Sequence, residues 1–253
     1  MPRGRLGLLA ILCCLLAALS VSGAKGALVA VEDIVLRADG SYHPNKLPRH
    51  EFVPIRFQGY FNIASRSGGK PIALQEVDID FDRDGRLSIG GLPSCAPEQI
   101  ANATPAEARR VCAAARVGGG RVEALIETDG GILRGASPLT IFNGPRIEGK
   151  SSVILHAQNT VPSLETFAIL VPIEQRRGEF RYRAHLVLPT IAGGRGAITR
   201  IEAKVGRTFS AGGKQRSYVS AHCSDGILRT HGRFHFVDGT VVDGAVEKGC
   251  TPR

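Results

Sequence analysis

The sequence predicts an all-β protein, and more narrowly a β-sandwich, jelly-roll-like or built from two related β-halves, with one short disulfide-linked helix. Three observations support this fold class. Segments of alternating apolar and polar residues recur along most of the chain, and turns rich in Gly and Asp separate them. The 31 glycines suit many tight reversals. One stretch alone has the pattern of a helix.

The first 24 residues have the pattern of a secretory signal peptide. Two arginines precede an apolar run over residues 6–19, and Ser22-Gly23-Ala24 supplies the small residues that a signal peptidase needs. This run is shorter than the ~20 residues that cross a bilayer. We therefore expect cleavage after Ala24, a secreted or cell-envelope-associated protein, and no transmembrane anchor in the mature chain.

The mature chain divides into an N-terminal segment, 25–46, and a β-sandwich domain, 47–253. In "VPIRFQGYFNI", from Val53 to Ile63, apolar and polar residues alternate as they do in a strand with one buried face. "GRVEALIETDG" and "GRFHFVDG" resemble each other weakly, which favours two β-halves, about 47–145 and 146–253. The further predicted strands are Arg121–Thr128, Ser152–Gln158, Thr166–Ile173, Phe180–Leu188, Ala197–Val205, Ser217–Cys223, Arg229–Val237 and Thr240–Glu247.

The predicted helix lies in "TPAEARRVCAAA". Thr104 and Glu107 form the Thr-x-x-Glu pattern of a capping box, and Pro105 suits the first helical position because its missing N–H would have no partner there. Cys112 lies on this helix, so a disulfide from it would attach the helix to the sheet.

Four of the six cysteines remain after cleavage of the predicted signal peptide. An even number in an exported chain predicts two disulfides, and we favour the sequence-local pairs Cys95–Cys112 and Cys223–Cys250. The alternative is a zinc site that combines these thiols with His222, His231 or His235, although the chain has no Cys-x-x-Cys pair.

The charge balance is basic. Removal of residues 1–24 leaves 30 basic and 23 acidic residues, a formal charge of +7. No run of five like charges occurs, and the arginines are scattered among apolar residues. For an exported protein the expected anionic partners are cell-envelope polymers rather than nucleic acid.

The stretch "DIDFDRDGRL" (residues 78–87) raises two hypotheses. Asp80, Asp82, Asp84 and Gly85 match the first half of an EF-hand-type calcium loop, but Gly91 stands where the bidentate glutamate should be. The same letters describe a strand whose aspartates face solvent, followed by an Asp-Gly hairpin turn. Same-face residues on a strand are ~6.6 Å apart, whereas calcium ligands lie within about 5 Å of one another. We therefore prefer the hairpin and keep calcium as the alternative.

The order of several landmarks resembles a group of uncharacterised secreted bacterial proteins. The landmarks are "EVDIDFDRDGRLSIGGLPSC" with its Gly-Leu-Pro-x-Cys corner, a second cysteine after a short helix, "ARVGGGRVEA", "IFNGP" and "RSYVSAHC". They cover most of the mature chain, from residue 47 to Cys250. The resemblance implies export and architecture, and implies no activity.

The chain carries no Gly-x-Ser-x-Gly elbow and no His-Glu-x-x-His motif. We therefore expect a non-enzymatic extracellular or cell-envelope protein with a binding or structural role. Two alternatives stay open. One is a hydrolase of envelope carbohydrate that uses a carboxylate pair, and the other is a calcium-stabilised adhesion module.

Overall fold

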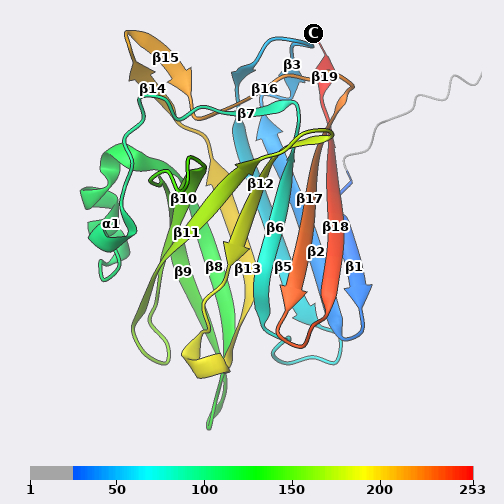
Figure 1. The fold of residues 1–253 in the computed structure, drawn as a ribbon. Helices are drawn as coiled ribbons and strands as arrows, with labels where there is room; N and C mark the ends of the chain where they lie inside the picture. Colours follow the sequence, from blue (N-terminus) through cyan, green and yellow to red (C-terminus); the bar gives the residue numbers. More distant parts are fainter. Residues whose placement is uncertain (1–24, 253) are drawn as a thin grey trace, which may run out of the picture.

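The computed structural model describes residues 25–252, so the predicted signal peptide lies outside the described residues. The protein is built on one twelve-stranded antiparallel sheet, in the order β1-β2-β5-β13-β8-β9-β10-β11-β12-β6-β17-β18 (Figure 1). Its strands are β1 Ala27–Val31, β2 Ile34–His43, β5 Arg56–Ser65, β6 Leu74–Asp82, β8 Arg116–Thr128, β9 Gly131–Asn143, β10 Ser151–Asn159, β11 Glu165–Gln175, β12 Phe180–Val187, β13 Gly196–Val205, β17 Ile227–Phe236 and β18 Val241–Gly249.

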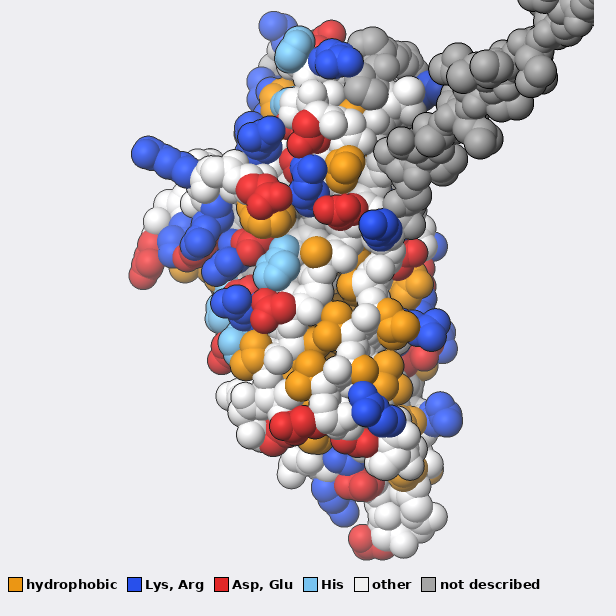
Figure 2. Space-filling model, turned by 90° about the vertical axis from the view of Figure 1, so that its right-hand side faces the viewer, with side chains coloured by type: hydrophobic (Ala, Val, Ile, Leu, Met, Phe, Trp, Pro, Cys, Tyr) orange, Lys and Arg blue, Asp and Glu red, His pale blue; other side chains and the backbone are white. Residues whose placement is uncertain are grey.

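This sheet curls until it nearly closes into a barrel. Its first and last strands, β1 and β18, meet where the backbones of Lys25 and Glu247 exchange two hydrogen bonds of 3.0 Å. Figure 2 views this side of the molecule, where apolar side chains gather in the middle of the face and charged ones surround them. The all-β prediction is confirmed, but the β-sandwich is corrected. The strands form one continuous sheet instead of two sheets packed face to face. A twisted sheet of this many strands coils, which brings its two edges together.

The N-terminal segment belongs to this sheet. Residues 25–46 were expected to precede the folded domain, yet β1 and β2 pair with each other, and β2 pairs with β5 along its length. Strands from 47–145 and 146–253 also alternate, since β13 lies between β5 and β8, and β6 lies between β12 and β17. The sheet therefore mixes distant parts of the chain.

The interior of the curled sheet holds the main core. The period-two pattern places one face of each strand inside, where the apolar side chains lose contact with water. Residues buried in this core include Leu36, Ile63, Val77, Ile126, Ile198, Phe234 and Val242.

The helix α1, Pro105–Val111, begins as predicted. The Glu107 backbone N–H donates to the Thr104 hydroxyl at 3.3 Å, and the Glu107 carboxylate accepts from the Thr104 N–H at 2.9 Å. The Cys95–Cys112 disulfide joins its C-terminal end to the preceding loop. The disulfide and the buried side of α1 pack against Phe142 and Ile154, and these residues form a small second core on the outside of β9 and β10.

Short elements cover the rest of the barrel. They are β3 Lys46–Leu47, β4 Val53–Pro54, β7 Gly85–Leu87, β14 Thr208–Ala211, β15 Lys214–Ser217, β16 Val219–Ala221, β19 Thr251–Pro252, and the 3-10 turns η1 Pro97–Gln99, η2 Ala113–Ala115 and η3 Ala192–Gly194. Strands β4, β16 and β7 form a three-stranded sheet at one end of the barrel, and Cys223–Cys250 is the second disulfide there. Within residues 25–252, no helix is both long and apolar enough to span a membrane.

Candidate functional site

Asp80 and Asp82 of the stretch DIDFDRDGRL lie on the outer face of β6, and Asp84 lies just beyond its end, but none of the three is exposed. Relative exposure is 5% for Asp80, 7% for Asp82 and 2% for Asp84. The side chains point away from the core, as predicted. The prediction that they face solvent is wrong, because the three residues are buried. Arg183 of β12 and His231 of β17 contact the Asp80 carboxylate, and Arg229 of β17 contacts that of Asp82. Asp84 is contacted instead by Ser224 and His222.

Asp80 is held by Arg183, its direct cross-strand neighbour on β12. The guanidinium donates from Nε at 2.8 Å and from a terminal nitrogen at 2.7 Å, which is a bidentate pair. Burial alone would raise the pKa of Asp80, but the hydrogen bonds and charge of Arg183 outweigh burial and hold that pKa below its ordinary value. On the other side His231 of β17 faces the same carboxylate. Arg183, Asp80 and His231 therefore lie side by side across the three neighbouring strands β12, β6 and β17.

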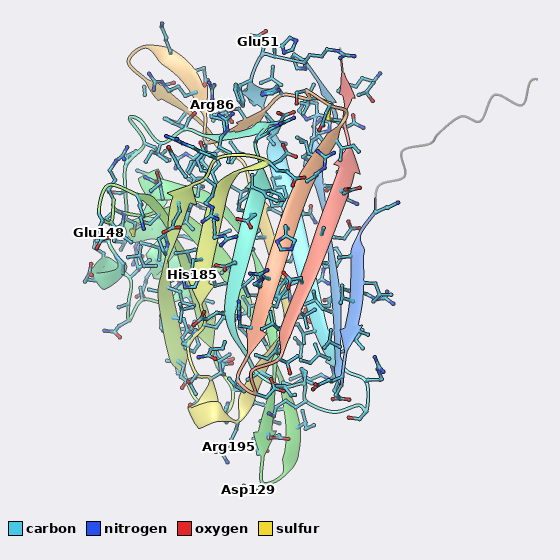
Figure 3. The ribbon with its side chains drawn as sticks, turned by 45° about the vertical axis from the view of Figure 1, so that its right-hand side comes forward. Glu51, Arg86, Asp129, Glu148, His185 and Arg195 are labelled. Carbon is cyan, nitrogen blue, oxygen red and sulfur yellow. A yellow bond between two sulfur atoms is a disulfide. The ribbon has the colours of Figure 1, made fainter. Side chains whose placement is uncertain are left out.

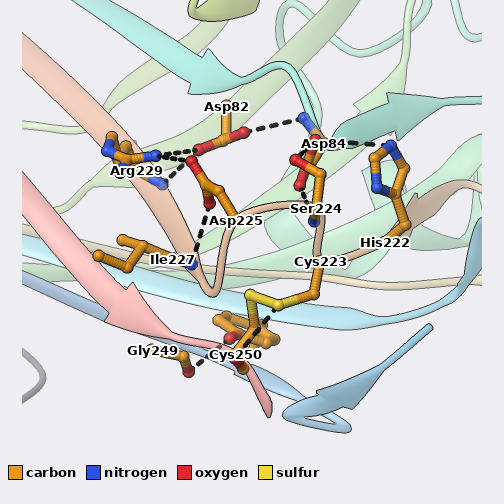
Figure 4. The surroundings of a disulfide bond; sticks show 11 residues. Asp82, Asp84, His222, Cys223, Ser224, Asp225, Ile227, Arg229, Gly249 and Cys250 are labelled. Atoms are coloured by element: carbon orange, nitrogen blue, oxygen red, sulfur yellow. Dashed lines mark hydrogen bonds and ion pairs between the residues drawn. A yellow bond between two sulfur atoms is a disulfide. The ribbon is translucent and has the colours of Figure 1, made fainter. Parts of the chain in front are cut away.

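Asp82 and Asp84 build the bend at the end of β6. Asp82 accepts from the backbone N–H of Asp84 at 2.8 Å and from that of Arg229 at 2.7 Å. Burial raises the pKa of the Asp82 carboxyl, and these donors offset the effect only in part. Asp84 accepts from the backbone N–H of Ser224 at 2.6 Å and from its hydroxyl at 3.0 Å (Figure 4).

The predicted hairpin is therefore corrected to a corner. After Asp82 the chain leaves the main sheet, and β7 pairs with β16 rather than with β6. Asp84 anchors this corner to the segment that carries Cys223, so the second disulfide and the corner stabilise each other's position (Figure 4). A local Asp-Gly pattern could not reveal these partners, because Ser224 is 140 residues away.

The structure also bears on the metal hypotheses. Asp80, Asp82 and Asp84 each bind a different set of donors. Within residues 25–252, no group of three or more His, Cys, Asp or Glu side chains is arranged to hold a metal ion. The calcium site therefore stays a prediction. The four cysteines form the two predicted disulfides, so their thiols are not zinc ligands.

A cluster of basic side chains around one aromatic ring lies beside this corner, and no sequence pattern pointed to it. We call it the Phe52 cluster: Phe52, Arg86, Arg181 and His222. The guanidinium carbons of Arg86 and Arg181 lie 4.3 and 5.3 Å from the centre of the Phe52 ring. The His222 ring meets the same ring edge-on, with centres 4.6 Å apart. Figure 3 places Arg86 at the end of the barrel that also carries Glu51, opposite Asp129 and Arg195.

The four residues come together through four separate elements. Phe52 precedes β4, Arg86 lies on β7, Arg181 on β12, and His222 follows β16. The pairing of β16 with both β4 and β7 brings the first, second and fourth of these together. His222 also connects the cluster to the corner, because its Nε2 lies 3.5 Å from the Asp84 carboxylate.

Arg86 and Arg181 give the cluster two positive charges. Among the residues that the structure describes, neither Arg86 nor Arg181 forms an ion pair with a carboxylate. Their contacts with one ring place the two charges within about 10 Å of each other, about one Debye length at roughly 0.1 M salt. His222 adds a buried Nδ1 atom without a hydrogen-bond partner. Stacking orients guanidinium planes and leaves their N–H edges free to donate. The arrangement can therefore receive an anion.

No protein-family profile, curated protein or solved structure matches the chain.

Proposed function

We propose that this protein is an exported, non-enzymatic binding protein that holds anionic polymers of the cell envelope through the Phe52 cluster. One observation carries the proposal: the guanidiniums of Arg86 and Arg181 lie over a single aromatic ring, and neither has a carboxylate partner within the described part of the chain. Two like charges held this close are stabilised when an anion binds between or beside them.

The chemistry of the cluster suits phosphate or carboxylate groups. A guanidinium presents paired N–H donors that match the two oxygens of either group. Two exposed cations precede Phe52 in the chain, Lys46 at the start of β3 and Arg49 on the loop that follows it. A polymer with repeated anionic groups can engage the cluster and this loop together, which strengthens binding without requiring a deep pocket.

Export is the second part of the proposal. The N-terminal pattern of residues 1–24 is typical of a signal peptide. Two disulfides in a chain of this size favour an oxidising compartment. The resemblance to secreted bacterial proteins agrees with this location. A fusion of residues 1–30 to an alkaline phosphatase that is active only outside the cytoplasm tests it, and an inactive fusion would contradict export.

The binding test uses two defined polyanions, long-chain polyphosphate and polygalacturonate. We expect the mature, oxidised protein to bind at least one of them, with affinity that falls as salt rises because bound counterions are released and charges are screened. The double variant Arg86→Ala/Arg181→Ala should bind about tenfold more weakly or worse, since one hydrogen bond to a charged group contributes about 1.5–3 kcal/mol.

The matched control is Arg37→Ala/Arg134→Ala. It removes the same net charge from exposed positions on β2 and β9. Equal losses in the two double variants would show that overall charge, rather than the Phe52 cluster, binds the polymer. No binding of either probe at low salt would refute the proposed function. Depolymerisation of a probe would refute its non-enzymatic part.

A further inference from the structure

The β10–β11 hairpin is attached to the sheet at one end only. The β9–β10 ladder covers Val153–His156 and stops, and the β11–β12 ladder covers only Ile173–Gln175. The rest of the hairpin is paired with itself, from Ser151–Ile173 to Asn159–Glu165. Figure 1 shows its loop flaring away from β8, β9 and β12. Backbone pairing of the hairpin with its neighbours β9 and β12 is therefore interrupted on both sides.

Proline explains where the two ladders end. Pro138 lies two residues before Thr140, the last residue of β9 that pairs with β10. Pro172 immediately precedes Ile173, where pairing with β12 begins. Because proline has no N–H, it cannot donate to a ladder. Beyond the β9–β10 ladder, the Gln158 N–H donates at 2.9 Å to the Ser137 hydroxyl instead of to a backbone carbonyl.

A partly open cavity of about 60 Å³ lies beneath the hairpin, inside the barrel. Carbon lines almost all of it, from residues that include Val122, Leu139, Leu155, Phe167, Ile169 and Ile198. No charged side chain lines it. Its two polar side chains are already engaged, Ser137 with Gln158 and Asn159 with Val161. The cavity therefore offers no free hydrogen-bonding group for a polar ligand.

We propose that this cavity binds the end of an unbranched aliphatic chain, such as the acyl chain of a lipid, whose polar end stays outside the barrel. A carbon-lined space stays dry and favours an apolar occupant. A cavity of about 150 Å³ holds benzene. The present cavity has less than half of that volume, so it admits a slender chain end and excludes an aromatic ring. The cavity is partly open and the ladders beside the hairpin are interrupted, which gives such a chain a route in. This inference is independent of the Phe52 cluster.

Chain length provides the sharpest test. Calorimetric titration of the mature, oxidised protein with n-alkanoates from butanoate to dodecanoate measures the affinity of each, below its micellar concentration. Each methylene that enters the cavity should strengthen binding about fourfold, since its transfer from water contributes about 0.8 kcal/mol. The gain should then level off when the cavity is full. Affinity that rises without a plateau would indicate non-specific adsorption and overturn the proposal.

A cavity-filling variant locates the site. Ala157 lines the cavity, so Ala157→Phe should fill it and lower affinity for the best alkanoate about tenfold or more. The control Ala30→Phe adds the same ring to the exposed face of β1 and should leave affinity unchanged. If Ala157→Phe unfolds, Ala124→Val at a second lining position makes the same test with a smaller side chain. Unchanged binding in a folded cavity variant, or equally tight binding of naphthalene carboxylate, would overturn the assignment.

Discussion

Asp84 accepts two hydrogen bonds from Ser224, 2.6 Å from its backbone nitrogen and 3.0 Å from its hydroxyl, across 140 residues of chain. The carboxylate is 2% exposed, so these bonds are shielded from water. A residue in a turn-like motif thus connects the end of β6 to the loop of the second disulfide. It also lies next to His222, which belongs to the Phe52 cluster.

Removal of this carboxylate should destabilise the protein. Asp84→Ala leaves the half-buried Ser224 N–H without its carboxylate partner, and we expect a loss of about 1–3 kcal/mol in the free energy of unfolding. Urea denaturation of the oxidised protein measures it. Asp129→Ala is the control, because that side chain is fully exposed and lies at the opposite end of the barrel. Equal stability of the two variants would show that the corner does not depend on Asp84.

The Asp80–Arg183 pair should make stability depend on acid pH. The folded-state pKa of Asp80 lies below its ordinary value, so its ionised form stabilises the fold above the unfolded-state pKa of about 3.9. That contribution is lost as pH falls through the folded-state pKa. Asp80→Asn should therefore be less stable than the natural protein at pH 7, and the difference should shrink below pH 4. Thermal unfolding between pH 7 and pH 2 measures it, and a constant difference would contradict this mechanism.

Gly120 should tolerate no side chain. A Cβ atom at this position on β8 would lie 1.8 Å from the carbonyl oxygen of Glu202 on β13, so one of the two strands must move. We expect Gly120→Ala to cost about 3 kcal/mol or more, at the upper end of overpacking effects. Gly130→Ala in the β8–β9 turn is the control, since its nearest neighbour would be 3.9 Å away. Similar denaturation midpoints for both variants would refute the close approach of the strands.

Each disulfide should contribute measurably to stability. The bridged cysteines are separated by 17 and 27 residues. In the chain-entropy model, closing a loop of this size lowers the entropy of the unfolded chain and so stabilises the folded state by about 3 kcal/mol. Cys95→Ala/Cys112→Ala should therefore lower stability while keeping the barrel, because it releases only α1 and its loop. Cys223→Ala/Cys250→Ala should also weaken polyanion binding, since Cys223 adjoins His222. Intact binding in the second variant would separate the disulfide from the Phe52 cluster.

Calcium should leave the thermal unfolding midpoint unchanged. Asp80, Asp82 and Asp84 already accept hydrogen bonds from Arg183, from backbone N–H groups and from Ser224. A site saturated to 100 times its dissociation constant would add about 2.7 kcal/mol, which raises the midpoint by several degrees. Scans with millimolar calcium and with chelator measure this. A rise that disappears in Asp82→Ala would establish the calcium loop instead.

Local patterns in the sequence were sufficient for the elements themselves. Period-two alternation identified most strands from β5 to β18, the Thr104–Glu107 capping box identified α1, and cysteine spacing identified both disulfides. These predictions succeeded because each depends on residues a few positions apart, or on the proximity that short loops favour. Strand β9 was missed because Gly135 and Pro138 interrupt its pattern.

The way in which these elements combine depends on contacts between distant parts of the chain. The near-closure of the sheet depends on β1 and β18 meeting across almost the whole chain, and no local pattern encodes that pairing. The aspartates of β6 are buried because Arg183 and Arg229 come from strands more than 100 residues away. The residues of the Phe52 cluster likewise form no recognisable sequence motif, because they lie far apart in the chain. Interactions between neighbouring residues are enough to specify the strands, the helix and the disulfides, whereas the sites arise from long-range contacts that exist only after the sheet has curled.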